Sequence, residues 1–350
     1  MKRGLRRFLS LLFILGTMAL VMWIAFSNND LGSAWELLFT LNPLYLLLAW
    51  GCWFAYTFFD ALGYHYFLRK QGYPVRMGYA VFLSLTGFYY SNITPGASGG
   101  QPMQIYYMSK RDIPIGIGTS AISMKFLSNQ LVTVVLASVL WALNLGFVNA
   151  QLSGVRWLYL IGWAINAAAV PLILMVTFCR RTVQRMLGGL VRLGTRMRII
   201  KRPDVAALRM NNMLDTYHAS FMRLGRHPKQ IFIQLMLSVL SVSGLMAIVL
   251  CVYAALGQSG VAWYELMTVA YLLFLSASYT PLPGASGAQE GGFLVFYHGL
   301  FAEGVLGMAL LVWRFMSYYM FLIVGAALSI IMQLRLSRAS RKVDASGERP

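Results

Sequence analysis

Long apolar runs dominate the pattern of hydrophobic and polar positions along the chain. A membrane-spanning helix needs about 20 consecutive apolar residues to cross a hydrocarbon core of about 30 Å. Six runs meet this requirement, whereas two further apolar stretches, residues 77–109 and 265–303, are broken near the middle by proline and glycine. We therefore predict an all-α integral membrane protein with about six full spans and two re-entrant helical hairpins. The predicted spans are residues 8–26, 44–68, 113–145, 157–178, 231–256 and 304–334.

The first run follows four basic residues and resembles a secretory signal peptide. A signal peptide ends at a cleavage site made of small residues. The stretch Ala25-Phe26-Ser27-Asn28 fits that pattern poorly, so we expect the first run to be retained as a span.

The composition supports a membrane protein. The chain is 58% hydrophobic and only 11% charged, whereas a soluble domain carries about 25% charged residues. With a mean hydropathy of +0.63, the chain has more apolar surface than one globular core can bury. This excludes a soluble enzyme, a secreted disulfide scaffold and a disordered protein. The three cysteines lie alone in separate apolar runs, so neither a disulfide framework nor a zinc site is predicted.

Basic residues indicate which side of the membrane each loop occupies, because Lys and Arg accumulate in cytoplasmic loops. Of the 29 Lys and Arg residues, 26 lie in five segments, namely residues 1–7, 69–76, 110–112, 180–229 and 335–350. All five segments can be cytoplasmic only if each broken stretch returns to the side from which it entered. Residues 77–109 then enter from the cytoplasm and residues 265–303 from outside. Both chain termini are expected in the cytoplasm.

The tips of the two predicted hairpins repeat one another. Residues 95–101 read PGASGGQ and residues 283–289 read PGASGAQ, which are identical at six of seven positions with an offset of 188. Downstream, Lys125-Phe126-Leu127-Ser128 matches Arg314-Phe315-Met316-Ser317 at an offset of 189. Two matches in the same order and at almost the same offset indicate an internal repeat.

The matches divide the membrane part into a first repeat, residues 1–150, and a second repeat, residues 151–334. The two hairpins open to opposite sides, so the repeats are inverted, an arrangement that places binding sites near the bilayer midplane. The second repeat includes the cytoplasmic basic segment 180–229, whose apolar and basic residues fall on different faces of a helix. Such a helix is typical of one lying on an anionic leaflet. Residues 335–350 form a polar cytoplasmic tail.

A further apolar stripe in the basic segment has helical spacing. It includes Leu214, Tyr217 and Phe221. We expect this stripe to pack against the bundle rather than on lipid, because three large apolar side chains recur on one helical face.

The composition of the hairpin tips suits an anion-binding turn. Proline ends a helix, and glycine permits the positive φ that reverses the chain. The freed backbone must be buried in protein or line a wet cavity, and N–H groups near a half-helix N-terminus suit an anion. The alternative is that both tips only pack together. The tip residues chosen as candidates for lipid binding are Pro95, Gly96, Ser98, Gly99, Pro283, Gly284, Ser286 and Gly287.

Lys125 and Arg314 lie deep inside predicted spans, at equivalent positions of the repeat. A cation at this depth normally faces the bundle interior and has a partner. Glu290 follows the second tip and could pair with Arg314, receive a lipid amino group or carry a proton. We predict that Lys125, Arg314 and Glu290 bind the lipid headgroup. Asp60 and His65 are expected to form a local buried network.

The residues that carry this argument also carry a family resemblance. The second hairpin reads Pro281-Leu282-Pro283-Gly284 through Gln289-Glu290-Gly291, and Arg314-Phe315-Met316-Ser317-Tyr318 follows it. Together with the first hairpin, this pattern resembles the lysylphosphatidylglycerol synthase/flippase membrane-domain family over about residues 8–334. The resemblance implies an eight-element membrane domain that moves, or helps to move, a lipid between leaflets. A soluble aminoacyl-transferase domain follows the membrane part in bifunctional members. Because this chain ends at Pro350, we expect no synthase activity.

The first hypothesis is a lipid translocase, not an enzyme, of a bacterial or archaeal plasma membrane. Its cargo is a phospholipid or a polyprenyl-phosphate lipid with an anionic or zwitterionic headgroup. The alternatives are an intramembrane enzyme acting on lipid headgroups and a non-transporting scaffold or regulatory subunit in envelope synthesis. The chain has no GxxxxGK[ST] loop, so ATP-driven pumping by this chain alone is not expected. Membrane lipids are the expected partners, and the sequence is compatible with a homo-oligomer. No nucleic acid, cofactor, metal ligand or catalytic residue is predicted.

Overall fold

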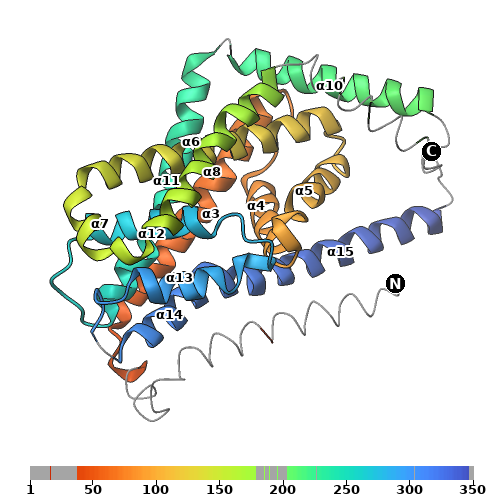
Figure 1. Cartoon of the computed structure of the whole chain (residues 1–350). Helices are drawn as coiled ribbons and strands as arrows, with labels where there is room; N and C mark the ends of the chain where they lie inside the picture. Colours follow the sequence, from red (N-terminus) through yellow and green to blue (C-terminus); the bar gives the residue numbers. More distant parts are fainter. Residues whose placement is uncertain are drawn as a thin grey trace.

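The computed structural model describes residues 38–178, 203–225, 227–302 and 304–346, together with the isolated residues 16, 185, 189 and 195. Within these residues the regular structure is entirely helical (Figure 1). Five helices are long and apolar enough to cross a membrane. They are Pro43–Lys70, Ile115–Leu143, Ser153–Met175, Pro228–Ala255 and Leu306–Leu334.

These helices correspond to five of the six predicted spans. The predicted first span, residues 8–26, lies outside the described residues. So does most of residues 180–202, which is the part of the basic segment expected to lie on the anionic leaflet, and so does the end of the tail, residues 347–350.

The main helices follow one another along the chain in the order expected from the apolar runs. They are α3 (Pro43–Lys70), α4 (Met77–Asn92), α5 (Gly100–Ser109), α6 (Ile115–Leu143), α7 (Leu145–Gln151), α8 (Arg156–Phe178), α10 (Pro203–Gly225), α11 (Pro228–Ala255), α12 (Trp263–Ala277), α13 (Ala288–Phe296), α14 (Leu306–Arg314) and α15 (Met320–Ser346).

Each broken apolar stretch forms two short helices joined by a three-residue 3₁₀ turn. The turn η1 (Pro95–Ala97) joins α4 to α5, and η3 (Pro283–Ala285) joins α12 to α13. The longest of these four helices has 16 residues. At 1.5 Å per residue it is about 24 Å long, which is shorter than a hydrocarbon core of about 30 Å.

Local sequence signals set where several helices begin. Asn42 caps α3 by accepting a hydrogen bond from the Leu44 N–H at 3.0 Å, and Pro43 occupies the first helical position. The Glu265 carboxylate accepts a hydrogen bond from the Ala262 N–H at 2.9 Å at the start of α12. These contacts satisfy N–H groups that have no partner within the helix.

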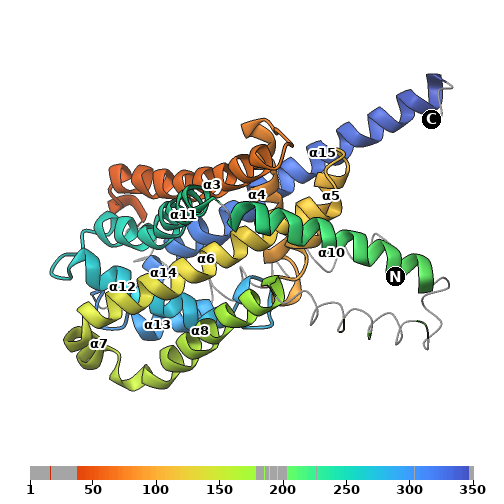
Figure 2. The same cartoon turned by 90° about the horizontal axis from the view of Figure 1, so that it is seen from above.

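Helices α3 and α11 lie side by side along most of their length (Figure 2). Gly244 permits this approach, because a Cβ atom at that position would lie only 3.2 Å from the Cys52 carbonyl oxygen. The Ser241 hydroxyl donates a hydrogen bond to the Tyr56 carbonyl at 3.0 Å. Across the same interface, the Cys52 and Cys251 sulfur atoms lie 3.8 Å apart. The structure therefore brings together two cysteines that are 199 residues apart in sequence.

The last predicted span is not a uniform α-helix. Helix α14 ends at Arg314, and a π-helical segment, η4 (Phe315–Tyr319), separates it from α15. A π-helical turn inside an α-helix is rare and occurs frequently at functional sites. The apolar pattern of residues 304–334 gave no sign of this interruption. Beyond it, α15 extends past the rest of the bundle (Figure 1).

Helix α10 packs against α6, as expected for the second apolar stripe. Leu214, Tyr217 and Phe221 are buried. A Cβ atom at Gly116 would lie 2.6 Å from the Thr216 side chain, so the glycine allows the two helices to approach closely.

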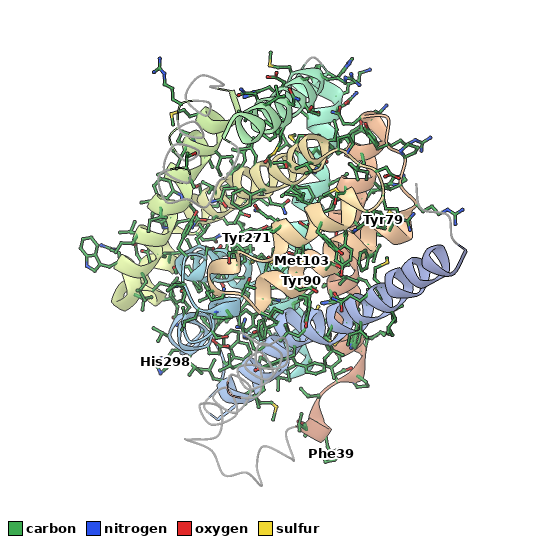
Figure 3. The ribbon with its side chains drawn as sticks, turned by 90° about the vertical axis from the view of Figure 1, so that its right-hand side faces the viewer. Phe39, Tyr79, Tyr90, Met103, Tyr271 and His298 are labelled. Atoms are coloured by element: carbon green, nitrogen blue, oxygen red, sulfur yellow. The ribbon has the colours of Figure 1, made fainter. Side chains whose placement is uncertain are left out.

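Many large apolar side chains point outward from the long helices. Leu47, Phe54, Ile161 and Phe232 are each more than half exposed. Apolar surface on this scale is typical of a protein that contacts lipid. Figure 3 shows Phe39 at the bottom of the molecule and His298 at its lower left, whereas Tyr79, near the start of α4, lies higher and at the right.

Candidate functional site

The two predicted hairpin tips adopt the same turn. Gly96 and Gly284 have φ values of 58° and 61°. The alanine that follows each glycine, Ala97 or Ala285, also has a positive φ, of 54° and 50°. A left-handed conformation costs a non-glycine residue about 1–2 kcal/mol. The repeated sequence therefore folds twice into the same strained reversal.

The serine of each tip makes the same hydrogen bond. The Ser98 hydroxyl donates to the Pro95 carbonyl at 2.9 Å, and the Ser286 hydroxyl donates to the Pro283 carbonyl at 3.0 Å. These serines therefore stabilise their own turns.

The tips differ after the serine and in their environment. Gly99 continues in a helical conformation, whereas Gly287 has a φ of 86° and precedes α13. The first tip is exposed, whereas Pro283 and Ser286 of the second tip are buried. The tips contact each other, because the Gly96 N–H donates a hydrogen bond to the Pro281 carbonyl at 3.0 Å.

Arg314 is buried and is held by the second hairpin. Its Nε donates to Glu290 Oε1 at 2.7 Å, and its Nη2 donates to the Gly284 carbonyl at 2.8 Å. The guanidinium carbon lies 4.2 Å from the centre of the Tyr318 ring. The hydroxyl of Tyr318 donates to the Asn92 carbonyl at 3.3 Å, which links this cluster to the first hairpin.

Glu290 is 1% exposed and uses both carboxylate oxygens. Oε1 accepts from Arg314, and Oε2 accepts from the Gly287 N–H at 2.6 Å at the start of α13. A carboxylate at this position also interacts favourably with the positive end of the helix dipole. In this structure Glu290 orients Arg314.

Lys125 is equally buried, and its partner is Asp60, a residue predicted from the sequence to form a network with His65. Its ammonium group forms an ion pair with the Asp60 carboxylate and donates to the Asp60 backbone carbonyl at 2.9 Å. It also lies 4.2 Å from the centre of the Tyr64 ring. The expected Asp60–His65 network is absent among the described contacts, because His65 Nδ1 bonds to the Val75 carbonyl at 2.8 Å.

The two cations therefore have the same kind of environment. Each has one carboxylate, one backbone carbonyl and one tyrosine ring. A buried charge in a membrane protein is costly without such partners. The two carboxylates, however, do not come from equivalent helices of the two halves. Asp60 is on α3, which precedes the first pair of short helices, whereas Glu290 is on α13, which belongs to the second pair.

A cavity of about 350 Å³ lies between the two tips and the middle of the long helices. Both tips contribute to its wall through the Gly-Ala pairs at 96–97 and 284–285, and Arg314 lines it as well. Gln130 and Asn166 add polar groups, and Gln130 Nε2 donates to Asn166 Oδ1 at 2.8 Å. Tyr56 is among the aromatic residues of the wall.

Only some of the predicted site residues line this cavity. Gly96, Gly284 and Arg314 do, whereas Lys125 and Glu290 do not. The remaining candidates, namely Pro95, Ser98, Gly99, Pro283, Ser286 and Gly287, belong to the tips but are not among the lining residues.

Sequence reasoning missed several residues of the site. Gln130 and Asn166 carried no recognisable signal. Ser317 did carry one, because it ends the repeated motif that begins at Arg314. Ser317 lines the cavity, and its hydroxyl oxygen, like that of the equivalent Ser128, is buried without a hydrogen-bond partner among the described residues. No group of three or more His, Cys, Asp or Glu side chains converges in the described part of the chain.

A family model described as the lysylphosphatidylglycerol synthase TM region matches residues 7–325. The chain belongs to this family. The match includes both tips and both buried cations, so the site lies within the part of the chain that the family defines. A UPF0104 membrane protein of Archaeoglobus fulgidus is 21% identical over 314 residues, which covers 87% of this chain and 91% of that protein. No solved structure matches the chain. Its family and its apolar helices make the chain a multi-pass membrane protein.

Proposed function

We propose that this chain is a lipid translocase that moves an anionic or zwitterionic lipid, either a phospholipid or a polyprenyl-phosphate carrier, between leaflets. The observation that carries the proposal is the cavity in the middle of the bundle, lined by both hairpin tips and by Arg314. Irregular backbone at membrane depth is tolerated where it lines such a cavity. We assign no catalytic residue.

The groups around the cavity suit a phosphate-containing headgroup. Arg314 uses Nε and Nη2 for its protein contacts, and no described residue accepts a hydrogen bond from Nη1. A charge-assisted hydrogen bond from a guanidinium to a phosphate is about twice as strong as a neutral one. The cavity volume is at the small end of ligand pockets, so the headgroup would enter it while the acyl chains stay in the bilayer.

The inverted-repeat proposal explains why Lys125 is outside the cavity. The shared turn of the two tips and the shared environment of the two cations support two equivalent halves. Inverted repeats exchange their conformations when a transporter changes its access from one side to the other. We propose that Lys125 lines the cavity in the second state, in which the first hairpin takes the present role of the second.

The same proposal includes the topology. Each pair of short helices forms a re-entrant hairpin, residues 77–109 entering from the cytoplasm and residues 265–303 from outside. The chain lies in the plasma membrane with both termini in the cytoplasm. The shortness of α4, α5, α12 and α13 supports this arrangement.

The test is transport of fluorescent lipids in proteoliposomes. Lipids with phosphate-containing anionic and zwitterionic headgroups are compared with a glycolipid that has no phosphate, and the lipids are extracted afterwards. Headgroup-dependent movement of chemically unchanged lipid supports the proposal. A chemically altered lipid would indicate an intramembrane enzyme instead. If no lipid is moved or chemically altered, the remaining interpretation is a scaffold or regulatory subunit.

A further inference from the structure

The wall of the cavity contains a cation but no acid among the described residues that line it. The cation is Arg314, and no Asp, Glu, Lys or His belongs to the described lining. Glu290, the acid that pairs with Arg314, does not line the cavity, and both of its oxygens already accept hydrogen bonds, at 2.7 and 2.6 Å. The described wall therefore offers a positive group to a ligand and no carboxylate to receive an amine.

Two uncharged polar residues flank the buried ion pair. Gln289 directly precedes Glu290 on α13 and is only 8% exposed. Ser317 lies three residues after Arg314, within the π-helical segment, and its hydroxyl oxygen is buried without a hydrogen-bond partner among the described residues. Both residues line the cavity. Amides and hydroxyls donate as well as accept hydrogen bonds, so a ligand hydroxyl group is a suitable partner for each.

A second polar part of the wall is held in place by the backbone. Asn166 Nδ2 donates to the Gly162 carbonyl at 2.7 Å and to the Leu275 carbonyl at 3.1 Å. Asn166 Oδ1 accepts from Gln130 Nε2 at 2.8 Å. The two amides, which both line the cavity, are therefore oriented before any ligand binds. Such pre-organisation lowers the entropy cost of binding a polar ligand.

Aromatic rings can bind a cation in place of an acid, but the rings next to Arg314 are engaged in other contacts. The guanidinium carbon of Arg314 lies 4.2 Å from the centre of the Tyr318 ring. Trp313 stacks on Phe293, with 4.8 Å between the ring centres. A ligand ammonium group beside Tyr318 would be repelled by the guanidinium that already occupies that ring.

We propose that the cavity selects a lipid phosphate whose headgroup carries hydroxyl groups and discriminates against one that carries an amine. Arg314 binds the phosphate, and Gln289 and Ser317 exchange hydrogen bonds with the hydroxyls. An amine would lose its hydration beside a guanidinium without gaining a carboxylate, and an uncompensated buried charge is costly. Phosphatidyl polyols and polyprenyl-phosphate sugars share the selected chemistry. The inference rests on the proposed function only in taking a lipid as the ligand.

Binding of short-chain lipids to the full chain in detergent, measured by native mass spectrometry, tests this selectivity without a transport readout. The probes are dihexanoyl phosphatidylglycerol, which is anionic and hydroxylated, phosphatidylpropanol, which is anionic without hydroxyls, and phosphatidylethanolamine. A short prenyl sugar phosphate is compared with the prenyl phosphate alone. Each hydroxylated probe that fits should bind about tenfold more tightly than its comparators, because they leave buried polar groups unpaired.

Tight binding of only one hydroxylated probe identifies the source of the headgroup and supports the inference. Phosphatidylethanolamine binding as tightly as phosphatidylglycerol overturns it. So does the absence of any preference for the hydroxylated probes, or of binding by every probe.

Substitutions at Gln289 locate the selectivity in the cavity. Gln289→Glu places a carboxylate in the first turn of α13, where the helix dipole favours it. Its affinity for phosphatidylglycerol should fall about tenfold, and phosphatidylethanolamine should become the better ligand. Gln289→Leu should weaken the preference for phosphatidylglycerol over phosphatidylpropanol. Gln230→Glu is the matched control, because it adds the same charge at the start of α11, outside the cavity, and should keep the wild-type order. A wild-type order in Gln289→Glu overturns the inference.

Transport measurements then separate this inference from the proposed function. If phosphatidylglycerol binds preferentially while no lipid moves in proteoliposomes, the headgroup selectivity stands and the translocase proposal fails. If phosphatidylglycerol and phosphatidylethanolamine bind and move equally well, the selectivity is wrong and the translocase proposal stands.

Discussion

Arg314 contacts a carboxylate, a carbonyl and an aromatic ring. A substitution of Arg314 therefore removes structural contacts as well as the proposed phosphate-binding group. Glu290 is its ionic partner, and Gly284 supplies the carbonyl from the hairpin tip. Removing one member of a buried pair leaves an uncompensated charge, which typically costs 3–5 kcal/mol. The structural role of Arg314 and its proposed phosphate-binding role must therefore be separated by a second substitution.

Arg314→Gln should lower the thermal stability of the purified protein and abolish lipid transport. The double variant Arg314→Gln with Glu290→Gln should regain stability, because neither charge is left alone, but it should still fail to transport. Arg314→Lys should be partly active, since it keeps the charge but loses the planar fork of donors. Thermal unfolding and proteoliposome transport are measured on each variant. Full transport by the double variant would show that Arg314 only pairs with Glu290.

The two tip glycines offer a matched comparison. Both have a positive φ, so alanine at either position costs about 1–2 kcal/mol from backbone strain alone. A Cβ atom at Gly284 would collide with the Tyr318 ring, whereas at Gly96 no atom lies within 4 Å. Gly284→Ala should therefore reduce stability and transport more than Gly96→Ala. Equal effects of the two substitutions would contradict the packing of the second tip on Tyr318.

At the level of helices, the interface between α3 and α11 joins the two halves of the chain. Gly244 allows the close approach, and the Ser241 hydroxyl bonds to the opposite backbone. Alternating access by inverted repeats would require the two halves to move relative to one another. A covalent link across this interface would test whether they do.

Oxidation should cross-link Cys52 to Cys251. Their sulfur atoms lie 3.8 Å apart and must approach to about 2.05 Å in a disulfide. A membrane-permeant two-electron oxidant should consume both thiols, as measured by mass spectrometry after alkylation. Cys52→Ser and Cys251→Ser are the controls and should each prevent the link. Two free thiols after complete oxidant treatment would mean that α3 and α11 do not pack as described.

The apolar runs predicted the positions of the described helices well, because length and hydropathy alone decide which segments can enter a membrane. The Pro-Gly tips predicted both helix breaks, since the backbone chemistry of these residues is local. The ion pair between Lys125 and Asp60 could not be predicted, because it depends on how α3 packs on α6. The π-helical segment after Arg314 has no hydrophobic signature. Arg314 was recognised because it belongs to the repeated pattern, and Glu290 because it directly follows the second tip, where the first half has Pro102.

On the scale of the whole molecule, the two buried cations lie at comparable distances from the starts of their helices. Lys125 lies ten residues from the start of α6, and Arg314 lies eight residues from the start of α14. At 1.5 Å per residue these positions are about 15 Å and about 12 Å along their helices, which is close to the middle of a core of about 30 Å. If α6 begins at the cytoplasmic side and α14 at the outer side, as we propose, this placement fits two inverted halves.

Labelling of single cysteines tests this orientation in a background where Cys52, Cys179 and Cys251 are replaced by serine. A membrane-impermeant maleimide added to intact cells should react with cysteine at Ser153 and at His298, which are exposed at the proposed outer face. Cysteine at Arg76 or at Lys110, which are exposed at the proposed inner face, should react only after the membrane is permeabilised. If residues 77–109 crossed the membrane once instead of returning, Arg76 and Lys110 would lie on opposite sides. Labelling of Lys110→Cys from outside would therefore show that the first hairpin is not re-entrant, and the inverted repeat would fail with it.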